Sequence, residues 1–194
     1  MISFDTRKEM LSSLVPKGGV VAEIGVFEGE FAEFILNTLS PSKIYMLDLF
    51  NGVCGSGDQD GNNYKNTDLT ASFLYLNAKY VNDTRVEIQR GNSKDLLADL
   101  DDNSLDMIYI DGDHAYEGCK ADLELAYQKC KTGAWICGHD YEMNMKKARH
   151  NYVFGVRKAV DEFCAKYGQT IHAKGLDGCV SYAIRLSKEL PTSS

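Results

Sequence analysis

The stretch VVAEIGVFEG, residues 20–29, decides the fold. Its first half is a short apolar run typical of a buried strand, and Gly25 and Gly29 then allow a tight turn. In residues 28–39, apolar side chains recur at the spacing of one helical face. The stretch therefore predicts a strand, a turn and a helix in succession, which is the repeating unit of an α/β sheet.

The same alternation of strand-like and helix-like segments continues along the chain. Helices are predicted over residues 28–39, 69–80, 93 to about 100, 119–131 (closed by Gly133) and 156–167. Strands are predicted over residues 20–25, 43–49, 85–90, 105–110, 134–138, 169–173 and 179–186. The pattern predicts an α/β fold with a doubly wound, seven-stranded sheet that is mostly parallel. One antiparallel strand is expected near the C-terminus, and helices are expected on both faces.

Two segments show no helical or strand period. Residues 51–68 are polar and glycine-rich, and their length favours a lid-like loop over an ordinary connection. Residues 142–152 include Lys146, Lys147 and Arg149, and this basic loop is expected to overhang the site because it follows a strand end. It could bind a phosphate or carboxylate of a substrate, although a solvated charged face is the more common role of such a run.

Length and charge limit the possible functions. The 194 residues suit a single domain, 1–194, and 44% of them are hydrophobic. The formal net charge of −7 argues against a nucleic-acid partner and an anionic membrane surface, because both require a basic face. No apolar run approaches the roughly 20 residues that span a bilayer, and the first ten residues lack the apolar region of a signal peptide.

The cysteines indicate the cellular compartment. All six are scattered, and none forms a C-x-x-C pair. This usage favours free thiols in a reducing, cytoplasmic location over a disulfide framework or a structural zinc site.

Reactive side chains gather directly after predicted strands. Asp111, Asp113 and His114 follow the fourth strand, and His139 and Asp140 follow the fifth. Neighbouring parallel strands end at the same edge of a sheet, where ligands bind, so we expect the two groups to converge. Two imidazoles and several carboxylates in one crevice indicate acid–base or metal chemistry. An ion-paired cluster with a purely structural role is the alternative.

The glycine turn restricts the ligand. It reads G-x-x-x-G and lacks the G-x-G-x-x-G of dinucleotide-binding enzymes. Glu23 and Glu28 would oppose a pyrophosphate, and they suit a ligand with hydroxyls and positive charge. Asp48 follows Gly25 at the distance, about 20 residues, from which a carboxylate accepts hydrogen bonds from ribose hydroxyls. These features count against an NAD-dependent oxidoreductase, which is kept as an alternative.

Taken together, the motifs resemble a known family. The runs VAEIGVFEG, YMLD, RGNS, IDGDHAYE and GHDY are similar to those of class I, Rossmann-like S-adenosylmethionine (SAM)-dependent methyltransferases. The similarity is to the small-molecule branch that contains the catechol and antibiotic-sugar O-methyltransferases. It covers about residues 18–186. The resemblance implies a Rossmann-like form of the sheet predicted above.

The resemblance also implies a role for each matching residue. The cofactor-binding positions are Glu23, Gly25, Phe27, Gly29, Asp48, Asn92, Ser93 and Asp111. The positions of the protein's metal ligands, for Mg²⁺ or Mn²⁺, are Asp111, His139 and Asp140. His139 replaces the usual carboxylate, which leaves metal use open. His114 replaces a catalytic lysine by a base whose ordinary pKa lies nearer to neutrality.

We therefore hypothesise SAM-dependent methyl transfer to a hydroxyl of a small molecule, such as a sugar or a sugar-containing metabolite. His114 and Asp111 are the expected catalytic residues, with His114 as the base. The alternative is a non-catalytic or differently reacting relative on the same fold, for example a hydroxylase-like or glycan-modifying protein. The expected partner is a small acceptor, for which the basic loop allows a negative charge. The sequence is also compatible with a homo-oligomer, since dimers are the commonest oligomers.

Overall fold

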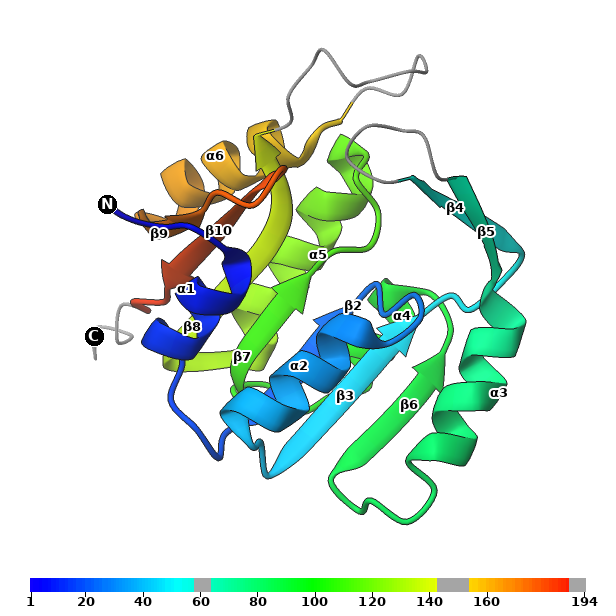
Figure 1. Cartoon of the computed structure of the whole chain (residues 1–194). Coiled ribbons are helices and arrows are strands. Elements are labelled where there is room, and N and C mark those ends of the chain that lie inside the picture. The colour runs from blue at the N-terminus through cyan, green and yellow to red at the C-terminus, as the bar shows by residue number, and fades with distance from the viewer. Residues whose placement is uncertain (58–63, 143–153, 189–194) are drawn as a thin grey trace.

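The computed structural model describes residues 1–57, 64–142 and 154–188, and its main feature is one eight-stranded sheet (Figure 1). The strands of this sheet are β1 (Ile2–Phe4), β2 (Val20–Ile24), β3 (Lys43–Asp48), β6 (Val86–Arg90), β7 (Leu105–Ile110), β8 (Cys130–Glu142), β9 (Ile171–Gly175) and β10 (Val180–Arg185). The helices are α1 (Arg7–Leu14), α2 (Glu30–Leu39), α3 (Leu69–Lys79), α4 (Ser93–Ala98), α5 (Tyr116–Lys129) and α6 (Val156–Tyr167).

The strand order is β1-β9-β10-β8-β7-β2-β3-β6. Strand β10 runs antiparallel to both of its neighbours, and the other pairs are parallel. The predicted doubly wound α/β sheet with one antiparallel strand near the C-terminus is therefore confirmed, and all seven predicted strands belong to it. The eighth strand, β1, was missed because three mostly exposed residues are too few to show a period.

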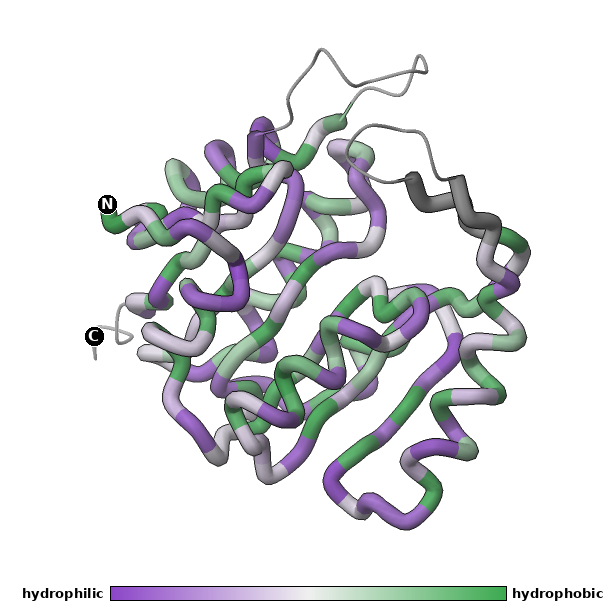
Figure 2. Tube along the Cα trace, viewed as in Figure 1, coloured by the Kyte–Doolittle hydropathy of each residue, from purple (hydrophilic) through white to green (hydrophobic). Residues whose placement is uncertain are grey.

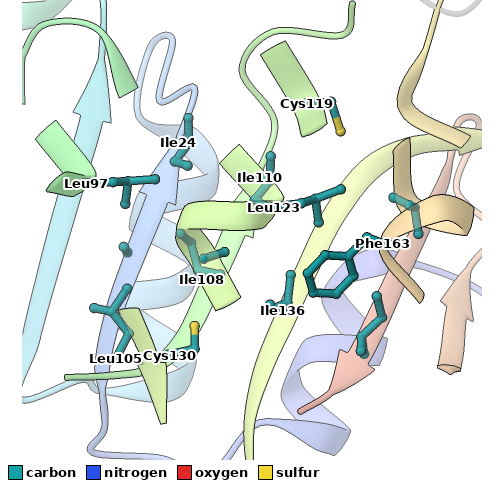
Figure 3. Packing of buried hydrophobic residues seen from close by; sticks show 14 of the residues in the cluster. Ile24, Leu97, Leu105, Ile108, Ile110, Cys119, Leu123, Cys130, Ile136 and Phe163 are labelled. Carbon is teal, nitrogen blue, oxygen red and sulfur yellow. The ribbon is translucent and has the colours of Figure 1, made fainter. Parts of the chain in front are cut away.

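Helices cover both faces of the sheet, as expected. Alternate residues of each central strand point to opposite faces. One apolar cluster joins Met107 and Cys137 to the buried sides of α1, α2 and α3. The other joins Ile108 and Ile136 to α4, α5 and α6, and Figure 3 shows this second layer around Leu123 and Phe163. In Figure 2 the central strands β2, β3 and β7 carry mostly hydrophobic colours, as burial on both faces requires.

The segment predicted as a structureless loop, 51–68, contains secondary structure. Strands β4 (Val53–Gly57) and β5 (Tyr64–Asp68) pair antiparallel in a separate two-stranded sheet beside α3 (Figure 1). The segment has no alternating apolar residues, and this absence explains the wrong prediction. Residues 58–63, in the middle of the predicted lid, lie outside the described residues.

The predicted role of Gly133 as a helix C-cap is also wrong. Helix α5 ends at Lys129, and Gly133, with φ of 85°, lies within β8. Residue Leu105 pairs with Cys130, but Met107 pairs with Trp135, so extra residues bulge out of β8 between these two pairs. A glycine suits this bulge because the left-handed conformation costs it little.

Two findings bear on the environment of the protein. No helix in the described ranges combines the length and the apolar character needed to cross a membrane. The five cysteines with described side chains are free thiols, and Cys119, Cys130 and Cys137 are buried among apolar residues.

Candidate active site

A cavity of about 780 Å³ opens at the carboxyl ends of the parallel strands. This edge is where ligands bind in doubly wound sheets, because loops leave the strands there and helix N-termini face it. Most of the predicted cofactor-binding residues line the cavity, namely Glu23, Gly25, Phe27, Asp48, Asn92, Ser93 and Asp111. Gly29 does not line it. A Cβ atom on Gly29 would lie 2.5 Å from Leu76 of α3, so this glycine serves helix packing at the start of α2.

Gly25 allows the closest backbone approach in the site. Its φ is 86°, and a Cβ atom there would lie only 2.0 Å from the carbonyl oxygen of Asp111. The amide of Asp111 donates to the carbonyl of Ile24 at 2.8 Å. The turn after β2 is thus fixed against the end of β7, which places Asp111 at the mouth of the glycine turn.

Asp48 organises the turn on the other side. Its Oδ2 accepts a hydrogen bond from the amide of Phe27 at 3.0 Å, and its Oδ1 accepts one from the amide of Phe50 at 2.7 Å. Phe27 is held at φ of 55°, a conformation that is unfavourable for a bulky side chain. Each carboxylate oxygen has a second lone pair, so Asp48 can still accept hydrogen bonds from ribose hydroxyls.

Asn92 and Ser93 lie where β6 passes into α4. Asn92 is the N-cap, and its side chain accepts a hydrogen bond from the amide of Lys94 at 2.9 Å. Ser93 donates to Oδ1 of Asp122, on α5, at 2.7 Å. Asp122 is buried, and burial raises its pKa to about 6 against the opposing effect of the Ser93 hydrogen bond. This hydrogen-bonded pair fixes the wall of the cavity at the first turn of α4.

Glu23 places a buried carboxyl group inside the cavity. The side chain is 1% exposed, and its Oε2 has no hydrogen-bond partner among the described residues. Burial, with a further contribution from Asp111, raises the pKa of Glu23 well above its usual value. A buried, unpaired carboxylate is costly to a protein, and a cationic ligand would offset that cost.

The histidines and aspartates converge as predicted. Nε2 of His114 lies 2.9 Å from Oδ2 of Asp140 and 3.4 Å from Oδ1 of Asp111. Nδ1 of His139 lies 3.3 Å from Oδ2 of Asp140 and 3.7 Å from Oδ1 of Asp111. The ring of His114 also stacks on Phe154, with centroids 5.1 Å apart. We call these four residues, Asp111, His114, His139 and Asp140, the His–Asp cluster.

The electrostatics of the His–Asp cluster follow from these contacts. Burial opposes a charged imidazole, but hydrogen bonds to Asp111 and Asp140 outweigh it and raise the pKa of His114 to about 10. Burial would raise the pKa of Asp140, but hydrogen bonds from His114 and His139 lower it far below its usual range. Asp140 also adopts φ of 57°, a strained conformation of the kind often found at functional sites.

Three members of the cluster could hold a metal ion. One ligand atom each from Asp111, His139 and Asp140 can be chosen so that all lie within 4.8 Å of one another. Carboxylate oxygens with one imidazole suit Mn²⁺ and softer divalent ions better than Mg²⁺, which prefers oxygen alone. His114 competes for the same carboxylates, so a bound cation would have to replace its hydrogen bonds.

The structure adds residues that the sequence analysis missed. Arg7, at the start of α1, lies 3.2 Å from Oδ2 of Asp111 and also lines the cavity. Asp177, in the turn between β9 and β10, lies 3.8 Å from Arg7. Cys179 comes from the same turn, and burial together with the nearby carboxylate of Asp140 raises the pKa of its thiol to about 12. No local pattern marks these residues. Arg7 reaches the site through the pairing of β1 with β9, and the turn that holds Asp177 and Cys179 reaches it through the pairing of β10 with β8.

The predicted basic loop falls almost entirely on residues that the structure does not describe. Residues 143–153, which include Lys146, Lys147 and Arg149, lie outside the described residues. Its position over the site is therefore still a prediction.

The doubly wound sheet, the acidic cavity at its carboxyl edge and the glycine turn together define the class I, Rossmann-like SAM-dependent methyltransferases. A match to the methyltransferase-domain family covers residues 22–141, and the chain belongs to that family. Its cofactor is accordingly SAM, and the cavity suits this ligand. The volume is in the range of small-molecule sites. Glu23, whose buried Oε2 has no hydrogen-bond partner among the described residues, is complementary to a cationic nucleoside.

Solved structures support the fold. A SAM-dependent methyltransferase from Aquifex aeolicus aligns over 93% of this chain and 89% of its own, with 14% identity and a TM-score of 0.61. The tRNA methyltransferase TrmK from B. subtilis aligns over 97% and 68%, with 11% identity and a TM-score of 0.61. Spermidine synthase from Thermotoga maritima aligns over 96% and 60%, with 16% identity and a TM-score of 0.59. At such identities the likeness establishes the fold alone.

No curated protein sequence matches the chain.

Proposed function

We propose that this SAM-dependent methyltransferase acts on a hydroxyl of a small molecule, such as a sugar or a sugar-containing metabolite. The observation that carries the proposal is the His–Asp cluster at the rim of the cofactor cavity. A hydroxyl must lose its proton during transfer, and imidazoles and carboxylates supply that chemistry. The acceptor oxygen bonds to the methyl carbon as the sulfur–methyl bond breaks, S-adenosylhomocysteine leaves, and the acceptor proton passes to the base.

We assign the roles as follows. Glu23, Gly25, Phe27, Asp48, Asn92 and Ser93 hold the cofactor, and Asp111 joins the cofactor cavity to the His–Asp cluster. His114 is the base, but its contacts with Asp111 and Asp140 raise its pKa to about 10, which favours the protonated imidazole near neutral pH. His114 can accept a proton from the acceptor only when Asp111 and Asp140 bind another positive group in its place. A divalent cation on Asp111, His139 and Asp140 would do this, and would also polarise the acceptor hydroxyl.

The identity of the acceptor is tested with a panel of candidate substrates. Transfer of a labelled methyl group from SAM is measured with sugars, nucleotide sugars, glycosides, catechols, matched amines, and bulk tRNA and rRNA. Hydroxyl compounds should be methylated, and phosphorylated and neutral forms of each test the predicted preference for an anion. Product from amines or RNA alone would overturn the proposal. Tight binding of S-adenosylhomocysteine with no turnover on any acceptor would favour the non-catalytic alternative.

The cation is tested by binding. Mn²⁺ should raise the melting temperature of the protein, because a ligand that binds only the native state stabilises it. Asp140→Asn should abolish this rise, since it removes a ligand charge at a position whose backbone, at φ of 57°, tolerates asparagine. Asp101→Asn, in an exposed turn, is the matched control and should keep the full rise. An equal rise in all three proteins would place the cation elsewhere.

A further inference from the structure

The chain contains a single Asn-Gly pair, Asn51–Gly52, and its asparagine lines the cofactor cavity. The pair lies between the end of β3 and the start of β4, and no role assigned above uses it. Asparagine loses its side-chain amide most readily when glycine follows, because glycine has no side chain to hinder attack by its own backbone nitrogen. The pair is therefore a candidate site of covalent change at the rim of the cavity.

Both groups that would react are accessible. Asn51 is exposed, and its side chain makes no hydrogen bond to the described part of the chain. Gly52 is also exposed, with φ of 74°, and a Cβ atom built on it would meet nothing within 4 Å. The carbonyl of Gly52 accepts a hydrogen bond from the amide of Leu69 at 3.0 Å, but its own amide donates to no group in the described ranges. The attacking nitrogen of Gly52 and the side-chain carbonyl carbon of Asn51 are thus both available.

Asn103 shows the opposite situation. It is exposed too, but its side chain accepts a hydrogen bond from Lys188 at 2.7 Å. The amide that follows it, of Ser104, donates to the carbonyl of Lys129 at 2.8 Å. Both reacting groups are occupied at Asn103, so this residue provides a control within the same molecule.

The main chain is fixed on both sides of Asn51. On one side, the amide of Phe50 donates to Oδ1 of Asp48 at 2.7 Å, and the side chain of Phe50 is fully buried. On the other side, the carbonyl of Gly52 is held by the amide of Leu69. A change in the length of the main chain at residue 51 must therefore displace one of these two anchors.

We propose that Asn51–Gly52 is a site of spontaneous deamidation, and that the product with a lengthened main chain weakens cofactor binding. The backbone nitrogen of Gly52 loses its proton and bonds to the side-chain carbonyl carbon of Asn51. The carbon–nitrogen bond of the side-chain amide breaks, and ammonia leaves. Water then opens the resulting succinimide ring at either of its two carbonyls.

The two openings have different effects on the main chain. One gives aspartate, which adds a negative charge and keeps the length of the chain. The other gives isoaspartate, in which the main chain runs through the former side chain and gains one carbon–carbon bond, about 1.5 Å. This insertion acts on Asp48 through Phe50, and Asp48 is the carboxylate expected to hold the ribose. The chemical step needs neither cofactor nor acceptor, and its effect on binding rests only on the family's cofactor.

The modification is tested by ageing the purified protein at pH 8 and at pH 6. Mass spectrometry of its peptides, with fragment ions that locate the change, should find deamidation at Asn51 and little at Asn103. The reaction should be faster at pH 8, because the attacking nitrogen must lose its proton. Calorimetry should show that the isoaspartyl protein binds S-adenosylhomocysteine about 10-fold or more weakly, the scale of one lost hydrogen bond to a charged group.

Two variants separate the causes. Asn51→Gln requires a larger ring for the same attack, and after ageing it should keep the affinity of its own fresh sample. Asn51→Asp supplies the charge without the longer chain, and should lose less affinity than the isoaspartyl protein. Equal deamidation at Asn51 and Asn103, or unchanged affinity of the isoaspartyl protein, would overturn the proposal. An equal loss in Asn51→Asp, or in aged Asn51→Gln, would overturn the role of chain lengthening. The mass measurement is independent of binding, so failure of the fresh protein to bind S-adenosylhomocysteine would contradict the cofactor assignment alone.

Discussion

Gly25→Ala is expected to destabilise the protein by about 3 kcal/mol or more and to abolish cofactor binding. At φ of 86° an alanine pays about 1–2 kcal/mol for the left-handed conformation alone. Its Cβ would also lie 2.0 Å from the carbonyl oxygen of Asp111 and 2.8 Å from Cα of Gly112. Both atoms belong to backbone, so they can move only if β2 and β7 separate. Overpacking of this kind typically costs about 1–3 kcal/mol more.

Urea denaturation and titration with S-adenosylhomocysteine check this expectation. Gly18→Ala is a matched control, because Gly18 has a similar φ of 81° but no atom within 4 Å of a built Cβ. It should lose only the conformational part, about 1 kcal/mol, and bind the ligand normally. Equal losses in the two variants would show that the contact with Asp111 is not the cause.

The contribution of His114 to stability is expected to depend strongly on pH. The imidazole has a pKa of about 10 in the folded protein, against an ordinary value of 6.5. Because the folded pKa is raised, the stabilisation is fully present below pH 6.5 and is lost as the pH rises through about 10. His114→Gln should therefore cost on the order of 2 kcal/mol at pH 6, after allowance for partial exposure, and almost nothing above pH 10.

Unfolding free energies of the wild type and His114→Gln, measured in EDTA between pH 6 and pH 10.5, test this prediction. EDTA matters because a cation on Asp111 and Asp140 would replace the proton of His114. His172→Gln is the control, because it makes the same substitution at an exposed imidazole. Nδ1 of His172 contacts only backbone groups. A difference between wild type and His114→Gln that stays constant over this range would show that His114 is not a proton carrier in the cluster.

Much of the site was predictable because it depends on local order along the chain. Asp111 and His114 follow one strand directly, and His139 and Asp140 follow the next. Once the alternation of strands and helices predicts a parallel sheet, these residues must meet at one edge. The glycine turn was predictable for the same reason, since a tight turn from a strand into a helix favours a glycine, here Gly25.

Sequence reasoning missed features that depend on distant contacts. Gly29 is packed closely against Leu76, about 50 residues away in sequence, and its expected contact with the cofactor stays a prediction. Gly133 was expected to close a helix, but the pairing of Cys130 with Leu105 ends α5 earlier. The paired strands β4 and β5 were missed because their sequence shows no apolar alternation.

The sequence by itself determined the class of fold, the edge of the sheet that binds the cofactor, and the identity of the His–Asp cluster. These follow from periodicity and from residue types placed directly after strands. Only the tertiary structure decided that His114 lies between Asp111 and Asp140, and that Oε2 of Glu23 is buried without a hydrogen-bond partner among the described residues. It also decided that Arg7 reaches Asp111 across more than half the chain. The physical reason is that burial and charge pairing depend on which atoms are close in space. Local sequence patterns do not show which segments far apart in the chain are in contact.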